Sequence, residues 1–218
     1  MTVDEREPGA ADPSGGTPAL IAGLLLPYVA VGAGWTWLHS GVAALVFYQA
    51  GIVLLAGTKL PARLKGLGRG AGGRLVWAFA PLVLLVALAF LRILPQLLVP
   101  GLDPAAWLES YGLTGGRLLY VAVAFGIVHP FLEEVHYQPL RGRAPVLAHV
   151  SYAAYHGMVL WGCFRDWVVG LTVLSLVGTS VLFHVFERGR FGPRLSLAVH
   201  AMADMLVAGV ALHWAGWI

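Results

Sequence analysis

Residues 17–58 contain no Asp, Glu, Lys or Arg. An α-helix needs about 20 apolar residues to cross a bilayer core, so this uncharged stretch is too long for one crossing and long enough for two. In its middle, His39-Ser40-Gly41 is typical of a tight turn. We therefore expect two membrane helices that form a scaffold hairpin. The glycines that predict close helix packing within it are Gly23, Gly32, Gly34, Gly41, Gly51 and Gly57.

The composition of the whole chain agrees with a membrane protein. Of its 218 residues, 58% are hydrophobic and only 11% are charged, whereas a typical soluble domain carries about 25% charged residues. This indicates an all-α, polytopic transmembrane helix bundle. Cys163 is the only cysteine, which excludes an internal disulfide and CxxC-type metal sites. The net charge of +3 is better explained by topology signals in loops than by nucleic-acid binding, for which there is no motif.

Residues 1–16 differ in composition from the rest of the chain. They carry four acidic residues, one arginine, and several prolines and glycines, which predicts a disordered tail. A secretory signal peptide would begin with a basic segment, so we expect the first apolar segment to stay in the mature protein. The predicted organisation is a tail over 1–16 and a single transmembrane domain over 17–218.

After the hairpin, uncharged stretches alternate with short polar segments. Residues 59–74 form a polar linker, and 100–116 are expected to be a loop with a short interfacial helix. Pro139 is expected to end the fourth span, and Pro193 to open the last. The count is about seven spans, with an eighth short or re-entrant segment as the alternative. The predicted spans beyond the hairpin are 75–98, 118–138, 146–164, 167–186 and 195–218.

The basic residues predict the orientation of the bundle. With the N-terminus inside and seven spans, eleven of the fourteen Lys and Arg residues fall on the inner side. Cytoplasmic loops carry this excess of positive charge. We therefore expect an integral, multi-pass protein of the plasma (inner) membrane with a cytoplasmic N-terminus.

Two adjacent carboxylates, Glu133 and Glu134, end the apolar run 122–136. A carboxylate at membrane depth costs at least ~2.5 kcal/mol, so ionisable groups there are candidates for function. Histidines lie at i−4 and i+3 from the first glutamate, on the same helix face: His129 and His136. Other polar pairs with i, i+4 spacing are Glu134 with Gln138, Tyr152 with His156, and His200 with Asp204.

Each of these residues also has a purely structural interpretation. A membrane histidine is often a hydrogen-bonded link between helices, and we expect that role for His39, His149, His184 and His213. The same role competes with a functional one at His129 and His136. Glu133, near a cytoplasmic helix end, could be hydrated by headgroup water and need no partner.

The order of these motifs on three late spans resembles the CPBP family, the CAAX-protease and bacteriocin-processing (Abi-type) intramembrane endopeptidases. The family pattern is Glu-Glu-x-x-x-Arg, then Phe-x-x-x-His, then His-x-x-x-Asn/Asp. In this chain the counterparts are Glu133-Glu134, Tyr152-x-x-x-His156 and His200-x-x-x-Asp204. The resemblance covers residues 75–218 as a CPBP-like catalytic core, and is most specific over 120–207.

One departure from the family pattern bears on activity. Gln138 stands where the family has Arg, which would be i+4 from Glu134 and able to pair with it. Gln138 can still donate a hydrogen bond, and Arg141 or Arg143 could supply the charge from the following turn. The change leaves open a protein that keeps the fold but has lost or altered the activity.

The resemblance and the chemistry together imply a hydrolytic mechanism. Glu133 would be the general base, and His156 would share the attacking water and pass a proton to the leaving amine. His200 would face the oxyanion, oriented by Asp204. A divalent metal such as zinc could instead be held by Glu133, His156, His200 and Asp204. No His-Glu-x-x-His motif is present and no other cofactor is implied.

The implied substrate is a membrane-associated protein or peptide cut near the cytoplasmic face. Prenylated CAAX tails are the eukaryotic-type substrate, while the Ala-, Gly- and Arg-rich composition suggests a high-GC bacterium with another precursor. Two alternatives remain: a non-catalytic immunity or scaffold protein of the same fold, and a small transporter with buried Glu and His. The sequence does not predict an oligomeric state.

Overall fold

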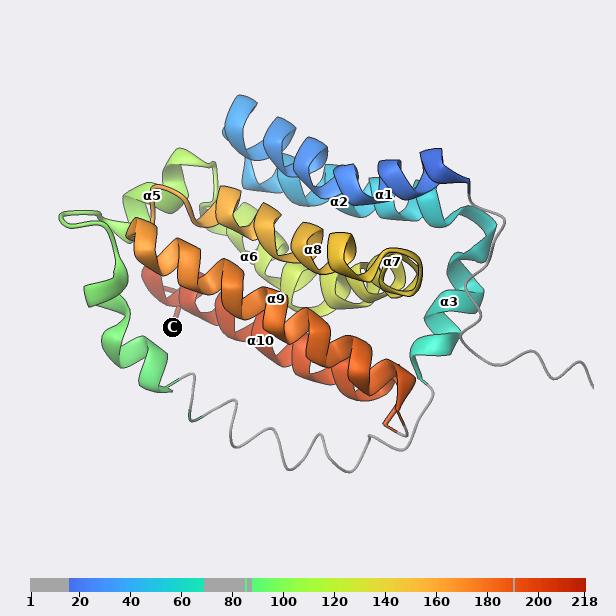
Figure 1. Ribbon diagram of the computed structural model, residues 1–218. Coiled ribbons are helices and arrows are strands. Elements are labelled where there is room, and N and C mark those ends of the chain that lie inside the picture. The colour runs from blue at the N-terminus through green and yellow to red at the C-terminus, as the bar shows by residue number, and fades with distance from the viewer. Residues whose placement is uncertain (1–15, 69–84, 86–87, 190) are drawn as a thin grey trace, which may run out of the picture.

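The structure is a computed structural model that describes residues 16–68, 85, 88–189 and 191–218 (Figure 1). Within these residues every element is helical. The predicted tail, apart from its last residue, and half of the predicted span 75–98 lie outside the described residues, although Leu88–Leu97 is helical. The α-helices are α1 (Thr17–Val31), α2 (Gly41–Ala56), α3 (Leu60–Leu67), α5 (Pro104–Ser110), α6 (Gly115–Val123), α7 (His129–Arg143), α8 (Pro145–Leu160), α9 (Asp166–Arg188) and α10 (Pro193–Trp214).

Five continuous helices among the described residues are long and apolar enough to cross a membrane. Several combine an α-helix with the π- or 3₁₀-helical segment that continues it, so they are longer than the named α-helices. The predicted all-α architecture is confirmed for the described residues, and these long apolar helices are compatible with a membrane bundle. The five helices are Thr17–Trp37, Gly41–Leu67, Gly115–Arg143, Asp166–Arg188 and Pro193–Trp214.

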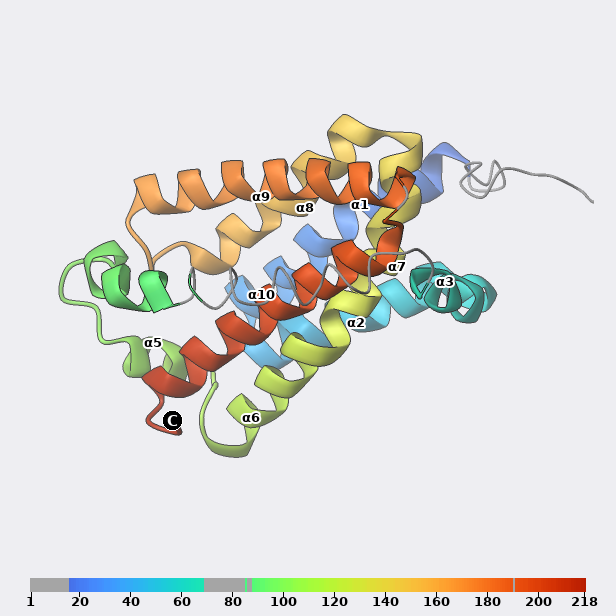
Figure 2. The same ribbon diagram turned by 90° about the horizontal axis from the view of Figure 1, so that it is seen from below.

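Helix α7 packs against helices from both halves of the chain. The α1–α2 hairpin and α3 contact it, as do α8 and α10, while α9 packs mainly on α8 and α10 (Figures 1 and 2). The end of α7, the start of α8 and the turn between α9 and α10 gather at the same end of the bundle as α3. Helix α5 and the C-terminus lie at the opposite end (Figure 1).

The predicted turn in the hairpin is confirmed. His39 has a positive φ of 46°, and Ser40 caps α2 by accepting a hydrogen bond from the Ala43 amide over 3.2 Å. The helices meet closely at Gly34, where an added Cβ would lie 2.1 Å from the Ala44 nitrogen. Gly57 has a different role, because it has nothing within 4 Å of an added Cβ and takes a positive φ of 52° in the turn after α2.

Two predicted boundaries were wrong. Pro139 does not end its span, because α7 continues to Arg143 with the proline inside the helix. The missing N–H of Pro139 removes only the hydrogen bond to the Val135 carbonyl, and Arg141, two residues on, is anchored in the bundle by buried ion pairs. The first part of the expected linker 59–74 is helical, because α3 buries Leu67 against Val135 and Ala56.

Candidate functional site

The glutamate pair lies inside the bundle, and an irregular helical segment precedes it in the chain. Residues Ala124–Val128 form a π-helical turn between α6 and α7. Such single turns shift the register of the residues that follow and are frequent at functional sites. Gly126 lets α10 approach, since an added Cβ there would lie 3.3 Å from the Met205 Cα. Glu133 and Glu134, in the next turns, are both buried.

Glu133 has two unequal oxygens. Its Oε1 accepts hydrogen bonds from the Tyr48 hydroxyl, over 3.0 Å, and from the Tyr155 hydroxyl. Its Oε2 is buried without a hydrogen-bond partner, although it lies 3.1 Å from His200 Nε2 and 3.6 Å from His129 Nε2. Oε1 is therefore fixed by two hydrogen bonds, whereas Oε2 faces two histidines without accepting a hydrogen bond.

Glu134 is part of a buried ion-pair chain. Its Oε2 lies 2.5 Å from Arg141 Nη2, and its Oε1 lies 3.1 Å from His200 Nδ1. The guanidinium also binds Glu187 at the end of α9, through Nε over 3.3 Å and through Nη2. The charge that Gln138 lacks is thus supplied by Arg141, which is fully buried.

His200 joins the two glutamates. Its Nδ1 is hydrogen-bonded to Glu134 Oε1 over 3.1 Å, and its Nε2 lies at ion-pair distance, 3.1 Å, from Glu133 Oε2, which accepts no hydrogen bond. Asp204, one turn along α10, lies 3.7 Å from His200 Nε2 through an Oδ2 that has no hydrogen bond. The rings of Phe183 and Tyr152 pack beside the imidazole, at centroid distances of 5.8 Å and 5.9 Å.

His156 is held differently from the other predicted catalytic residues. Its Nδ1 bonds the Tyr152 carbonyl over 2.8 Å, and its ring packs on Tyr155 at 4.1 Å. Because a carbonyl only accepts, Nδ1 carries the hydrogen and Nε2 remains an acceptor. Among the described contacts, His156 has no hydrogen bond or ion pair with Glu133 or His200, whereas the other four predicted residues are linked to one another directly.

The four predicted supporting residues have separate surroundings. His129 contacts Glu133, as described above. His136 points away to α1, where its Nε2 bonds the Gly23 carbonyl over 2.9 Å, and this is a structural link. Tyr152 packs edge-on against Tyr137 at 5.3 Å. Gln138 is half-buried, and no hydrogen bond from its side chain is recorded within the described part.

Sequence reasoning missed three residues of the site: Tyr48, Tyr155 and Glu187. The first lies in the hairpin that was expected to be scaffold only, and the second directly precedes His156. A signal was available for Tyr48, because Tyr48-Gln49 is a polar pair within the uncharged stretch. Glu187 lies next to Arg188 at the end of α9. In the sequence this stretch looks like an ordinary charged turn, so Glu187 was not singled out.

The proposed metal ligands do not form a set that could hold an ion. Among the described residues, no group of three or more His, Cys, Asp or Glu side chains is arranged to hold a metal ion. The reason is visible in the contacts: His156 binds its own helix, and Glu133 already receives two tyrosine hydroxyls. This donor set does not fit zinc.

The described residues line two notable cavities, and both lie away from the glutamates. The larger, of about 480 Å³, is bordered by Leu98, Arg165 and Trp214. The smaller, of about 280 Å³, is bordered by Glu109 and Trp217. Glu133 and His200 are at most 3% exposed. A substrate would therefore need helix movement to reach them.

Comparison with protein-family models, with curated proteins and with solved structures finds no match for this chain. The CPBP resemblance therefore remains a prediction from its motifs, and the function has to be argued from the geometry of the site.

Proposed function

We propose that this protein is an intramembrane endopeptidase of the CPBP type that uses Glu133 as its base. The observation that carries the proposal is the unequal environment of the Glu133 carboxylate. A buried carboxylate with one oxygen fixed by two hydroxyls, and the other facing a histidine without a hydrogen bond, has the geometry of a general base.

In the proposed reaction, Glu133 Oε2 takes a proton from a water molecule. The water oxygen attacks the carbonyl carbon of the peptide bond, and the carbonyl oxygen becomes an oxyanion. The His200 Nε2 hydrogen stabilises this oxyanion. The C–N bond then breaks as the proton passes to the leaving nitrogen. His156, whose Nε2 is an acceptor, serves as a second proton carrier.

The side chains around His200 fix its orientation for that role. Glu134 holds Nδ1, and Arg141 holds Glu134, so the imidazole plane is fixed through three linked side chains. Asp204 orients the ring and favours its charged form, as its position 3.7 Å from Nε2 allows. An ionised aspartate cannot itself donate to an oxyanion, so its role is orientation.

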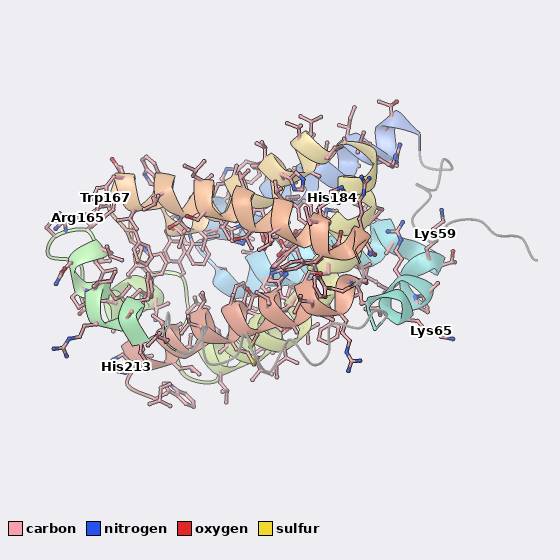
Figure 3. All side chains as sticks on the ribbon, turned by 60° about the horizontal axis from the view of Figure 1, so that its bottom comes forward. Lys59, Lys65, Arg165, Trp167, His184 and His213 are labelled. Atoms are coloured by element: carbon pink, nitrogen blue, oxygen red, sulfur yellow. The ribbon has the colours of Figure 1, made fainter. Side chains whose placement is uncertain are left out.

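We also propose seven spans with the N-terminus and the active site facing the cytoplasm. Lys59 and Lys65 lie at one end of the bundle, while Arg165 and His213 lie at the other (Figure 3). The first end also holds the basic residues that close α7 and α9. This distribution of charge supports the orientation.

The proposed substrate is a membrane-associated protein or peptide. A site within apolar helices, near one end of the bundle, suits a bond at the end of a membrane anchor better than a bond in a soluble loop. Because the glutamates are buried, the substrate segment would enter between helices as they separate.

Hydrolysis can be tested without knowing the substrate. The chain and its Glu133→Gln variant would each be reconstituted with membrane proteins of the organism that encodes it, in water enriched in ¹⁸O. Hydrolysis places ¹⁸O in each new C-terminal carboxylate, which mass spectrometry detects. New labelled termini with the wild-type chain and none with Glu133→Gln are expected. Equal termini with both would overturn the role of Glu133.

One observation favours a second candidate, a non-catalytic protein of the same fold. The glutamates are closed off in the bundle, and Glu134 has partners on both oxygens. This candidate predicts that the wild-type chain produces no labelled termini and that Glu133→Gln changes only its stability.

A further inference from the structure

Tyr48 and Tyr155 reach the same oxygen of Glu133 from two different helices. Tyr48 comes from α2, in the amino-terminal hairpin, and Tyr155 from α8. Both hydroxyls donate to Oε1. Their rings meet at a centroid distance of 5.4 Å in an edge-on arrangement, and both are buried. The pair is thus a preformed unit and not two separate contacts.

We propose that Tyr48 and Tyr155 are positioning residues that select Oε2 of Glu133 as the reactive oxygen. This inference rests on the proposed function, because it takes Glu133 as the base. A carboxylate whose two oxygens were equally free could rotate and present either one. Two donors on Oε1 hold the group in one rotamer and direct Oε2 at His200 Nε2, 3.1 Å away.

The tyrosines suit this purpose chemically. A phenol donates one hydrogen bond and, unlike an ammonium or guanidinium, leaves no positive charge beside the base. The carboxylate therefore keeps its negative charge, and Oε2, which accepts no hydrogen bond, faces His200 Nε2 at 3.1 Å. The hairpin, which carries no charged residue of its own over 17–58, contributes to the site through Tyr48.

Other charged groups also face Glu133 and have to be considered in a test. They come from α7 itself, from α8 and from α10, while α2 contributes only the phenol. Besides Tyr48 and Tyr155, the charged or titratable neighbours of the Glu133 carboxylate among the described residues include His129, Glu134, His136, Tyr137, Tyr152, His156, His200 and Asp204.

Infrared spectroscopy on the full chain in liposomes tests the inference without a substrate. The C=O band of the protonated Glu133 carboxyl is identified by its loss in Glu133→Gln and followed over pH. Removing one hydrogen bond to a carboxylate favours the protonated form. In Tyr48→Phe and in Tyr155→Phe, the pH of half-maximal band intensity should therefore rise by about one unit, a tenfold change in proton activity.

Tyr28→Phe is the matched control. Tyr28 lies in the same hairpin and also bonds across to α8, but its hydroxyl donates to the Ser151 carbonyl over 3.3 Å and not to Glu133. Its variant should leave the band unchanged. Should Tyr28→Phe shift the band as far as Tyr48→Phe, the effect would be loss of hairpin docking, and the inference would be overturned. It would also be overturned if neither Tyr48→Phe nor Tyr155→Phe moved the band.

The two proposals fail in different ways. If no substrate is cleaved but the band shifts as expected, the tyrosine pair still positions Glu133 and only the peptidase proposal is lost. If cleavage depends on Glu133 but the band does not move, the peptidase proposal stands and the tyrosine pair is excluded. Where a substrate is known, both phenylalanine variants should lower kcat with little change in KM.

Discussion

Arg141 Nη2 lies 2.5 Å from Glu134 Oε2, and neither side chain is more than 1% exposed. The same guanidinium binds Glu187 on α9, so one cation holds two carboxylates from two helices. A buried charge that loses its partner is costly, whereas the intact pair is close to neutral in free energy. The network therefore stabilises one packing arrangement of α7 against α9.

The first prediction concerns this cation. Arg141→Met should destabilise the protein by about 3–5 kcal/mol, because it leaves two buried carboxylates without their shared partner. Thermal unfolding in detergent would show this as a lowered Tm. Arg143→Met, in the same helix turn and half-buried, is the matched control and should have little effect.

Adding Glu187→Leu to Arg141→Met should recover part of the lost stability. The double variant removes one of the unpaired buried carboxylates that the single variant creates, so the two effects are not additive. Unfolding of both single variants and the double variant gives the coupling. Strict additivity would mean that the Arg141–Glu187 ion pair contributes nothing.

A third prediction concerns the histidine between the glutamates. His200→Ala should lower kcat by about 10²–10³, the usual cost of losing one oxyanion donor, with a smaller change in KM. His149→Ala is a suitable control, because His149 is also a buried membrane histidine but bonds Ser180 Oγ over 2.9 Å. If both variants cleaved equally well, His200 would be a packing residue.

Metal removal gives a fourth test. Because the described His, Asp and Glu side chains do not form a ligand group, EDTA and 1,10-phenanthroline should leave the appearance of ¹⁸O-labelled termini unchanged. Cleavage that stops with the chelator and returns with added zinc would contradict this and restore the four-ligand hypothesis.

The sequence predicted the helical bundle because hydrophobic runs and charge-free stretches report membrane helices directly. The glutamate pair, His200 and Asp204 stood out because ionisable groups are rare at that depth. Tyr48 was missed although it forms a polar pair with Gln49, since an apolar ring with one hydroxyl is ordinary in a membrane helix. The continuation of α7 past Pro139 could not be predicted either, because it depends on the anchoring of Arg141 by partners 7 and 46 positions away.

The position of His156 shows a further limit of spacing arguments. An i, i+4 pair such as Tyr152 and His156 predicts a shared helix face, but does not say whether the histidine bonds across the bundle or to its own backbone. The structure has the second arrangement. Rotamer and partner depend on tertiary packing, which the residue pattern along one helix does not contain.

The last prediction tests the orientation, and the single cysteine makes the experiment simple. Cys163 is fully buried in the turn between α8 and α9, and burial raises its thiol pKa to about 12. A thiol that is not ionised reacts poorly with maleimides. On a Cys163→Ala background, Lys65→Cys should react with a membrane-impermeant maleimide only from the cytoplasmic side, and Trp217→Cys only from the outer side.

Lys65 follows the second proposed span and Trp217 lies at the end of the last, so their labelling reports the orientation and whether an odd or even number of crossings separates them. With seven spans and the N-terminus inside, the two cysteines label from opposite sides. Labelling from the same side would indicate a different number of crossings between residues 65 and 217. Opposite sides in reversed order would mean that Glu133 and the basic end of the bundle face away from the cytoplasm.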